Sequence, residues 1–273
     1  MKLCKQLLFI LFFGLLPQLI GTDCGPGYAP FYGYSFINPQ ITEFDTDLAP
    51  FFLNFTKIHE EFFKSQQEIY QLDNITEWRE RYCNKATVED IRYIIYKASR
   101  FQLEDLLRAI DAPEGTSTNV GPLIANNSWG RYMLRNSCRE TVEYLIYAKR
   151  CEPHVTAPAE SWRQTERNIP AMQRLIDEAY EAFLRTESDY IKLRYAFQAI
   201  RLAHYARDYH QTLDLVEYYL PKIDNDPSIL EYWIMGHKAG ALQALGDYAE
   251  SAYLYSRIFE KCPGKRESAF RSF

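Results

Sequence analysis

The sequence lacks most of the motifs that would assign it to a class of protein. After the first 20 residues, no run reaches the 18 uncharged apolar residues that a transmembrane helix needs. There is no glycine-rich phosphate loop, no dinucleotide-binding fingerprint and no Gly-x-Ser-x-Gly elbow for a nucleophilic serine. Basic residues form no cluster and the net charge is −5, which argues against nucleic acid as a partner. These absences favour a non-enzymatic protein without a cofactor.

The first 21 residues have the pattern of an export signal. Lys2 and Lys5 precede an apolar run from Leu7 to Leu16 that is too short to span a bilayer, and Gly21 offers a small residue for cleavage. We expect a soluble mature protein that starts near residue 22 or 23 and lies in the periplasm or at the cell surface. An uncut membrane anchor is the alternative. The acidic residue before Cys24 fits a lipoprotein signal badly, so lipidation there is a minor alternative.

Cysteines are few, and none has the spacing of a metal site. The five that follow the signal are Cys24, Cys83, Cys138, Cys151 and Cys262. No two of them form a C-x-x-C pair, so zinc is not expected. Cys138 and Cys151 would lie roughly 20 Å apart on one continuous helix and could pair only if that helix broke between them. Buried free thiols and a single disulfide both remain open.

Residues 22–53 are rich in proline and glycine, which excludes a regular helix there. Five aromatic residues lie within nine positions: Tyr28, Phe31, Tyr32, Tyr34 and Phe36. This composition is not that of a disordered linker. We expect an irregular strap whose rings pack on the helical body, with a stacking surface for a sugar or peptide as the alternative.

Helical periodicity dominates the remainder, and no alternating pattern is long enough for a strand. In the region 54–168 we expect helices over 54–71, from Asn74 through Tyr82, over 87–98 and 101–110, and over 129–149 after a loop at 111–128. A proline-containing loop from Pro153 then leads to a helix over 171–185. The predicted fold is all-α.

Two similar turns mark the region 169–273. Arg207-Asp208-Tyr209 and Gly246-Asp247-Tyr248 each follow an amphipathic run, and their tyrosines are 39 positions apart. A fixed period of this size is typical of stacked helical hairpins. Ser228 to Glu231 forms a capping box that starts the second hairpin.

This stretch resembles the tetratricopeptide repeat. Ala239 and Leu242 match the helix-packing positions of that motif, residues 245–248 match its turn, and Tyr255 and Pro263 match its second helix and closing proline. The first copy departs from the motif because an arginine replaces the turn glycine and the period exceeds the usual 34 residues. The resemblance implies a right-handed helical solenoid.

A second resemblance is to a family of uncharacterised exported proteins from Bacteroidetes-type bacteria. It rests on residues 193–202, Tyr232-Trp233 and residues 238–242. Members tend to be longer than this chain, and the resemblance implies no known activity.

The candidate partner-binding residues are Arg194, Arg201, Tyr205, Tyr232 and Trp233. Arg194 and Arg201 are seven positions apart, on one helix face, and could hold an acidic peptide end. The alternative is an arginine face that is solvated or paired within the chain. His204 and His210 flank a turn, where solvent-exposed histidines are favoured over a metal site.

We therefore expect a non-enzymatic exported scaffold that binds a protein partner through the groove of its repeats. The alternative is an enzyme or glycan-binding accessory protein that uses the aromatic N-terminal third. Few residues follow the final hairpin, so the apolar edge of the helix over 247–261 should be partly bare. Such an edge suits a fragment of a longer repeat protein or a surface that docks on a partner.

Overall fold

Helices make up nearly all of the chain that the computed structural model describes, which comprises residues 66–82, 84–113, 120–155, 167–223 and 227–273. No strand occurs in these ranges, so the all-α prediction is confirmed for them. The α-helices are α3 Gln66–Arg81, α4 Val88–Arg92, α5 Arg100–Ile110, α6 Pro122–Ala125, α7 Ser128–Arg135, α8 Arg139–Val155, α9 Ile169–Arg185, α10 Asp189–Ala206, α11 Tyr209–Tyr219, α12 Ile229–Leu245, α13 Tyr248–Lys261 and α14 Arg266–Ser272. Three short π or 3-10 helices adjoin them: η3 Tyr93–Lys97, η4 Leu220–Lys222 and η5 Pro263–Lys265.

All described residues belong to one structural unit, residues 56–273. The predicted signal (1–21), the aromatic strap (22–53), Cys24 and Cys83 lie outside the described residues.

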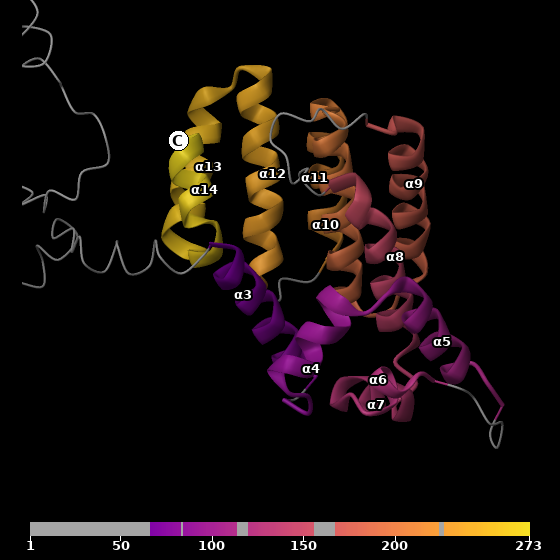
Figure 1. Ribbon diagram of the computed structural model, residues 1–273. Coiled ribbons are helices and arrows are strands. Elements are labelled where there is room, and N and C mark those ends of the chain that lie inside the picture. The colour runs from indigo at the N-terminus through magenta and orange to yellow at the C-terminus, as the bar shows by residue number, and fades with distance from the viewer. Residues whose placement is uncertain (1–65, 83, 114–119, 156–166, 224–226) are drawn as a thin grey trace, which may run out of the picture. The chain divides into compact units, whose positions relative to one another are not determined.

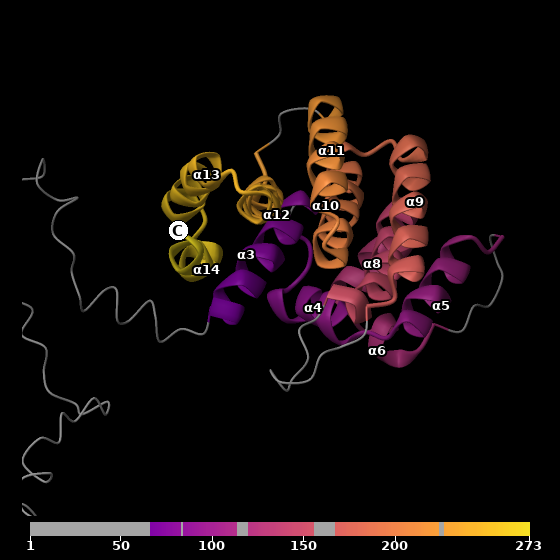
Figure 2. The same cartoon turned by 90° about the horizontal axis from the view of Figure 1, so that it is seen from above.

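Helix α10 is central to this unit. It packs against α8, α9, α11 and α12, while α13 packs on α12 and α14 on α13 (Figure 1). Helix α3, although first in the described chain, contacts α12 and the C-terminal η5 (Figure 2). Because α3 packs against the C-terminal end of the chain, α3, α10, α12 and η5 lie close together. These four elements contain the residues of the candidate site.

The two similar turns have equivalent backbones. Helices α10 and α12 each end at a residue in the left-handed region, Arg207 with φ 64° and Gly246 with φ 93°. The aspartate that follows, Asp208 or Asp247, accepts a hydrogen bond from the backbone amide three residues later and caps the next helix. Two hairpins with equivalent turns, α10–α11 and α12–α13, therefore follow one another.

The prediction that a new helix begins at Asn74 is wrong, because α3 runs through this position. The Asn74 side chain is buried. Its amide nitrogen donates to Tyr96 Oη at 2.8 Å, and its Oδ1 accepts from Arg194 at 2.9 Å. The Asn74 side chain therefore bonds to residues of η3 and α10 and does not mark the start of a helix.

The helix predicted over 129–149 is in fact two helices. Helices α7 and α8 are separated by residues 136–138, where Ser137 adopts a left-handed φ of 47°. Helix α8 then continues through Pro153, where a loop was expected. Proline in the last turn removes one backbone donor, and few intrahelical bonds remain there to be lost. The predicted loop at 111–128 contains the short helix α6.

The three described cysteines are free thiols. Cys138 directly precedes α8 and Cys151 lies within it, so no break separates the two residues. The disulfide that we left open between them is therefore absent from the structure.

The α12–α13 crossing is tight. Ala239 is fully buried, and the Ser251 hydroxyl of α13 donates to the Ala239 carbonyl oxygen at 2.9 Å. A small side chain on α12 is what allows the two helices to approach so closely.

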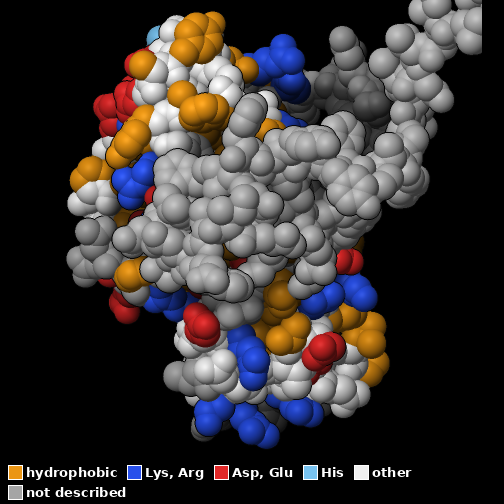
Figure 3. Space-filling view, turned by 90° about the vertical axis from the view of Figure 1, so that its left-hand side faces the viewer, with side chains coloured by type: hydrophobic (Ala, Val, Ile, Leu, Met, Phe, Trp, Pro, Cys, Tyr) orange, Lys and Arg blue, Asp and Glu red, His pale blue; other side chains and the backbone are white. Residues whose placement is uncertain are grey.

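Apolar side chains are exposed along α13 and α14, as expected for the edge of the final hairpin. The most exposed are Tyr248, Tyr253, Phe270 and Phe273, at 57–74%. Hydrophobic and charged side chains are interspersed on the described part of this side of the molecule (Figure 3). Helix α14 covers part of α13 through Phe270, whose ring lies 6.4 Å from that of Phe259.

Candidate functional site

Arg194 lies in the core and not on a surface. Its side chain is 3% exposed, and its guanidinium lies 4.0 Å from the centre of the Trp78 ring. It donates to Asn74 Oδ1 at 2.9 Å and to the Tyr190 hydroxyl. A partner could not reach Arg194 without opening this packing.

Glu77 balances the charge of Arg194 and extends the polar network to α12. One carboxylate oxygen lies 3.6 Å from the Arg194 guanidinium and accepts from Ser228 Oγ at 2.8 Å. The other accepts from the backbone amide of Ile229 at 2.8 Å, at the start of α12. The buried pair therefore joins α3, α10 and α12, and it fixes the elements that hold the surface residues described next.

Trp233 also lies in the core, at 3% exposure. Its ring stacks on Tyr70 of α3 with centres 3.9 Å apart, and it lies 5.5 Å from Phe197 of α10. Tyr232 is partly buried and packs against the same core. Of the five candidate residues, Arg194 and Trp233 therefore lie in the core, Arg201 and Tyr232 are partly exposed, and Tyr205 is exposed.

Arg201 and Tyr205 form part of a cluster that four elements build. We name it the basic-aromatic cluster and define it as Tyr70 of α3, Arg201, His204 and Tyr205 of α10, His237 of α12, and Lys265 of η5. Its members contact one another through ring–ring and cation–ring interactions.

Arg201 lies 5.9 Å from the Tyr205 ring, and the rings of His204 and His237 are 4.9 Å apart. The ammonium of Lys265 lies 4.6 Å from the Tyr70 ring.

Positive charge in this cluster has little compensation. Burial, together with the nearby charge of Arg201, lowers the pKa of Lys265 to about 8. Arg201 donates to the carbonyl oxygen of Val155 at 3.3 Å, and among the described residues no carboxylate forms an ion pair with Arg201 or Lys265. Asp73 lies nearby, but it accepts a hydrogen bond from the backbone amide of Gly264.

The two histidines are held in the neutral form. Burial lowers the pKa of His237 well below its usual value, and the charges of Lys265 and Arg201, with that of His204 whenever it is protonated, act in the same direction. Burial also lowers the pKa of His204, whose Nδ1 is buried without a hydrogen-bond partner in the structure. The cluster thus offers two cations flanked by neutral imidazoles and phenol rings, an arrangement suited to an anionic group.

Sequence reasoning missed Tyr70, His237 and Lys265. They lie on three separate elements and share no local motif with Arg201. The histidine that approaches His204 is His237 of the next hairpin, and not His210, which we had weighed with it. No group of three or more metal-ligating side chains occurs among the described residues.

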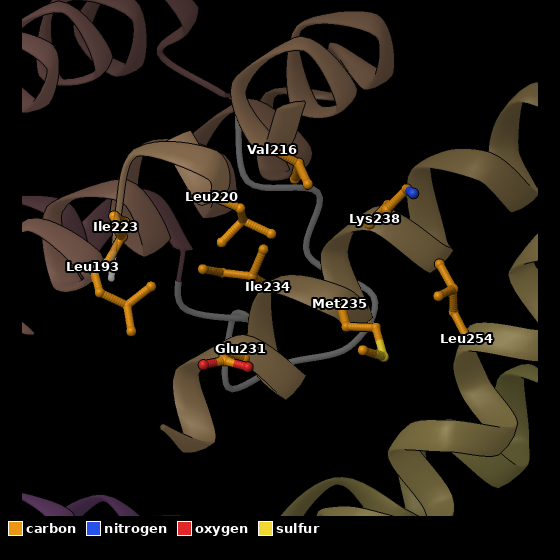
Figure 4. Close-up of a pocket in the computed structure, with 9 residues that line it drawn as sticks. All are labelled: Leu193, Val216, Leu220, Ile223, Glu231, Ile234, Met235, Lys238 and Leu254. Carbon is orange, nitrogen blue, oxygen red and sulfur yellow. The ribbon is translucent and has the colours of Figure 1, made fainter. Parts of the chain in front are cut away.

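A second feature of the same hairpins is an apolar cavity of about 280 Å³ that residues of α10, α11, η4, α12 and α13 line (Figure 4). Its lining residues are Leu193, Val216, Leu220, Ile223, Glu231, Ile234, Met235, Lys238 and Leu254. None of them belongs to the basic-aromatic cluster.

None of the helices in the described ranges is both long enough and apolar enough to cross a membrane. No protein-family model, no curated protein and no solved structure matches this chain. The resemblances noted from sequence therefore stay predictions, and the site has to be interpreted from its own geometry.

Proposed function

We propose that this protein is a non-enzymatic, exported scaffold of the cell envelope that binds an acidic segment of a protein partner at the basic-aromatic cluster. The observation that carries the proposal is the proximity of Arg201 and Lys265 in one partly buried site, where no carboxylate of the described ranges forms an ion pair with either of them. Bringing two cations together lowers stability, and an anionic ligand would offset that cost.

The arrangement of the helical hairpins also supports the proposal that the protein binds a peptide segment. The equivalent turns at Arg207 and Gly246 place two helical hairpins in succession, as in a right-handed solenoid of tetratricopeptide type. In such a fold a peptide contacts the first helix of several hairpins, and here α10 and α12 supply Arg201, Tyr205 and His237 to one cluster.

The alternative function, an enzyme or glycan-binding accessory, relies on the aromatic segment 22–53. That segment lies outside the described residues, so no observation favours it over the scaffold.

The test is affinity capture from an envelope extract of the source organism. The full chain should retain a specific protein, and the double change Arg201→Ala and Lys265→Ala should abolish that retention. The matched control is Arg135→Ala with Lys85→Ala, which removes two exposed cations elsewhere.

Synthetic peptides identify the segment that is recognised. An acidic peptide from the captured protein should bind the full chain, and its amide analogue, with Gln and Asn for Glu and Asp, should bind about tenfold or more weakly. Equal capture by the cluster variant and the control variant would refute the proposal.

A further inference from the structure

The apolar cavity between the two hairpins has the shape of a small-molecule site. Helices α11 and α13 both pack on α12, and the cavity lies where they flank it. Val216 of α11 and Leu254 of α13 line the cavity, and the fully buried Ile234 of α12 lies beside Leu220 (Figure 4). An apolar cavity of about 150 Å³ holds one benzene molecule, so 280 Å³ accommodates roughly a dozen carbon atoms.

The chemistry of the lining is aliphatic. Seven of the lining side chains are Leu, Ile, Val or Met, and none is aromatic, although aromatic residues make up 15% of the sequence. Met235 adds an unbranched, adaptable side chain. Flexible aliphatic walls suit a flexible alkyl chain better than a flat ring, which needs rigid parallel faces to stack on.

Two charged side chains are among the lining residues. Lys238 and Glu231 are seven residues apart on α12, about 10 Å along the helix, and Lys238 lies on the side of Leu254 (Figure 4). The Lys238 ammonium is bonded to Glu250 at 2.8 Å, in a pair whose side chains are 31% and 45% exposed. Exposed pairs of this kind contribute little, so Lys238 can exchange Glu250 for another carboxylate at small cost.

We propose that this cavity binds a medium-chain fatty acid, with the alkyl chain over Ile234 and the carboxylate at Lys238. The inference is independent of the basic-aromatic cluster, since none of its residues lines the cavity.

The experiment is calorimetric titration of the full chain with hexanoate, octanoate and decanoate below their micelle concentrations. Binding should saturate at one site, and affinity should rise about fourfold per methylene, as expected when each methylene is buried. Decylamine, with the same chain and the opposite charge, should bind more weakly than decanoate. An affinity that does not change with chain length would overturn the proposal, and equal or tighter binding of decylamine would overturn the placement of the carboxylate.

Two substitutions locate the site. Leu254→Trp should fill the cavity and weaken decanoate binding by about tenfold or more, the loss expected for two buried methylenes. Lys238→Ala should weaken decanoate binding and should not weaken decylamine binding, because an ammonium gains nothing from the lysine. The controls are Leu134→Trp on α7 and Lys85→Ala, which make the same changes at exposed positions outside the cavity.

Circular dichroism and thermal melting show whether each variant is folded. If Leu254→Trp does not fold, Met235→Trp fills the same cavity from α12 and replaces it. Decanoate binding that is unaffected by the cavity-filling change, or equally weakened by Leu134→Trp, would contradict the assignment.

Discussion

Removing the Glu77 carboxylate should destabilise the fold more than any surface change. In Glu77→Ala the buried guanidinium of Arg194 loses its counter-ion at 3.6 Å, and the start of α12 loses the acceptor for Ser228 and Ile229. Leaving one charge of a buried pair uncompensated costs about 3–5 kcal/mol. For a chain of this size we expect the melting temperature to fall by about 10 °C.

The measurement is urea unfolding of the full chain, followed by circular dichroism. Glu80→Ala is the matched control because it is the same substitution, one turn further along α3 at an exposed position, and should cost less than about 0.5 kcal/mol. A loss below about 1 kcal/mol in Glu77→Ala would refute the view that the pair holds the fold together.

A double-mutant cycle separates the ion pair from simple packing. Arg194→Met replaces the guanidinium by an apolar chain among Trp78 and Tyr190, so it removes the unpaired charge that Glu77→Ala creates. The double variant should therefore regain about 2 kcal/mol relative to Glu77→Ala alone. Additive losses would show that Glu77 and Arg194 stabilise the protein separately.

Three further changes test other parts of the structure. Ala239→Trp should lower the free energy of unfolding by roughly 1–3 kcal/mol or more, because the buried α12–α13 crossing has no room for a ring; an unchanged melting temperature would contradict the packing described here. Arg207→Gly should raise stability by about 0.5–1 kcal/mol, since Arg207 has φ 64° and glycine adopts that region without strain, and a loss in urea unfolding would argue against it. Stability should fall as the pH drops below about 6.5, because the unfolded chain protonates His237 more readily than the folded one does. The slope should approach about 1.4 kcal/mol per pH unit and be smaller in His237→Gln but not in His210→Gln, and equal slopes in all three proteins would exclude this cause.

The repeated turns could be predicted from sequence because their causes are local. A left-handed residue followed by a capping aspartate is determined within four residues, and Arg207-Asp208 and Gly246-Asp247 both conform. The all-α class followed from periodicity in the same way. The break at Ser137 and the passage of α8 through Pro153 were missed, because tertiary packing outweighs local propensity there.

The basic-aromatic cluster could not be predicted because its parts meet only after folding. Lys265 reaches it from η5, His237 from α12 and Tyr70 from α3. Each of these residues alone has the sequence signature of an ordinary helix residue. What distinguishes them is a shared environment in which no described carboxylate forms an ion pair with Arg201 or Lys265, and this environment cannot be deduced from sequence spacing.

The contrast between Arg194 and Arg201 shows how the fold assigns a role to each of two similar residues. They lie seven positions apart on one face of α10, about 10 Å along the helix, so periodicity treats them alike. Helix α3 packs over Arg194 and supplies Trp78, Asn74 and Glu77. These three side chains bury the Arg194 guanidinium and bind it through ring, hydrogen-bond and ion-pair contacts. Two turns further on, Arg201 lies near the Tyr205 ring and donates a hydrogen bond to the carbonyl oxygen of Val155. The position of α3 therefore decides which arginine is buried among the helices and which one stays partly exposed.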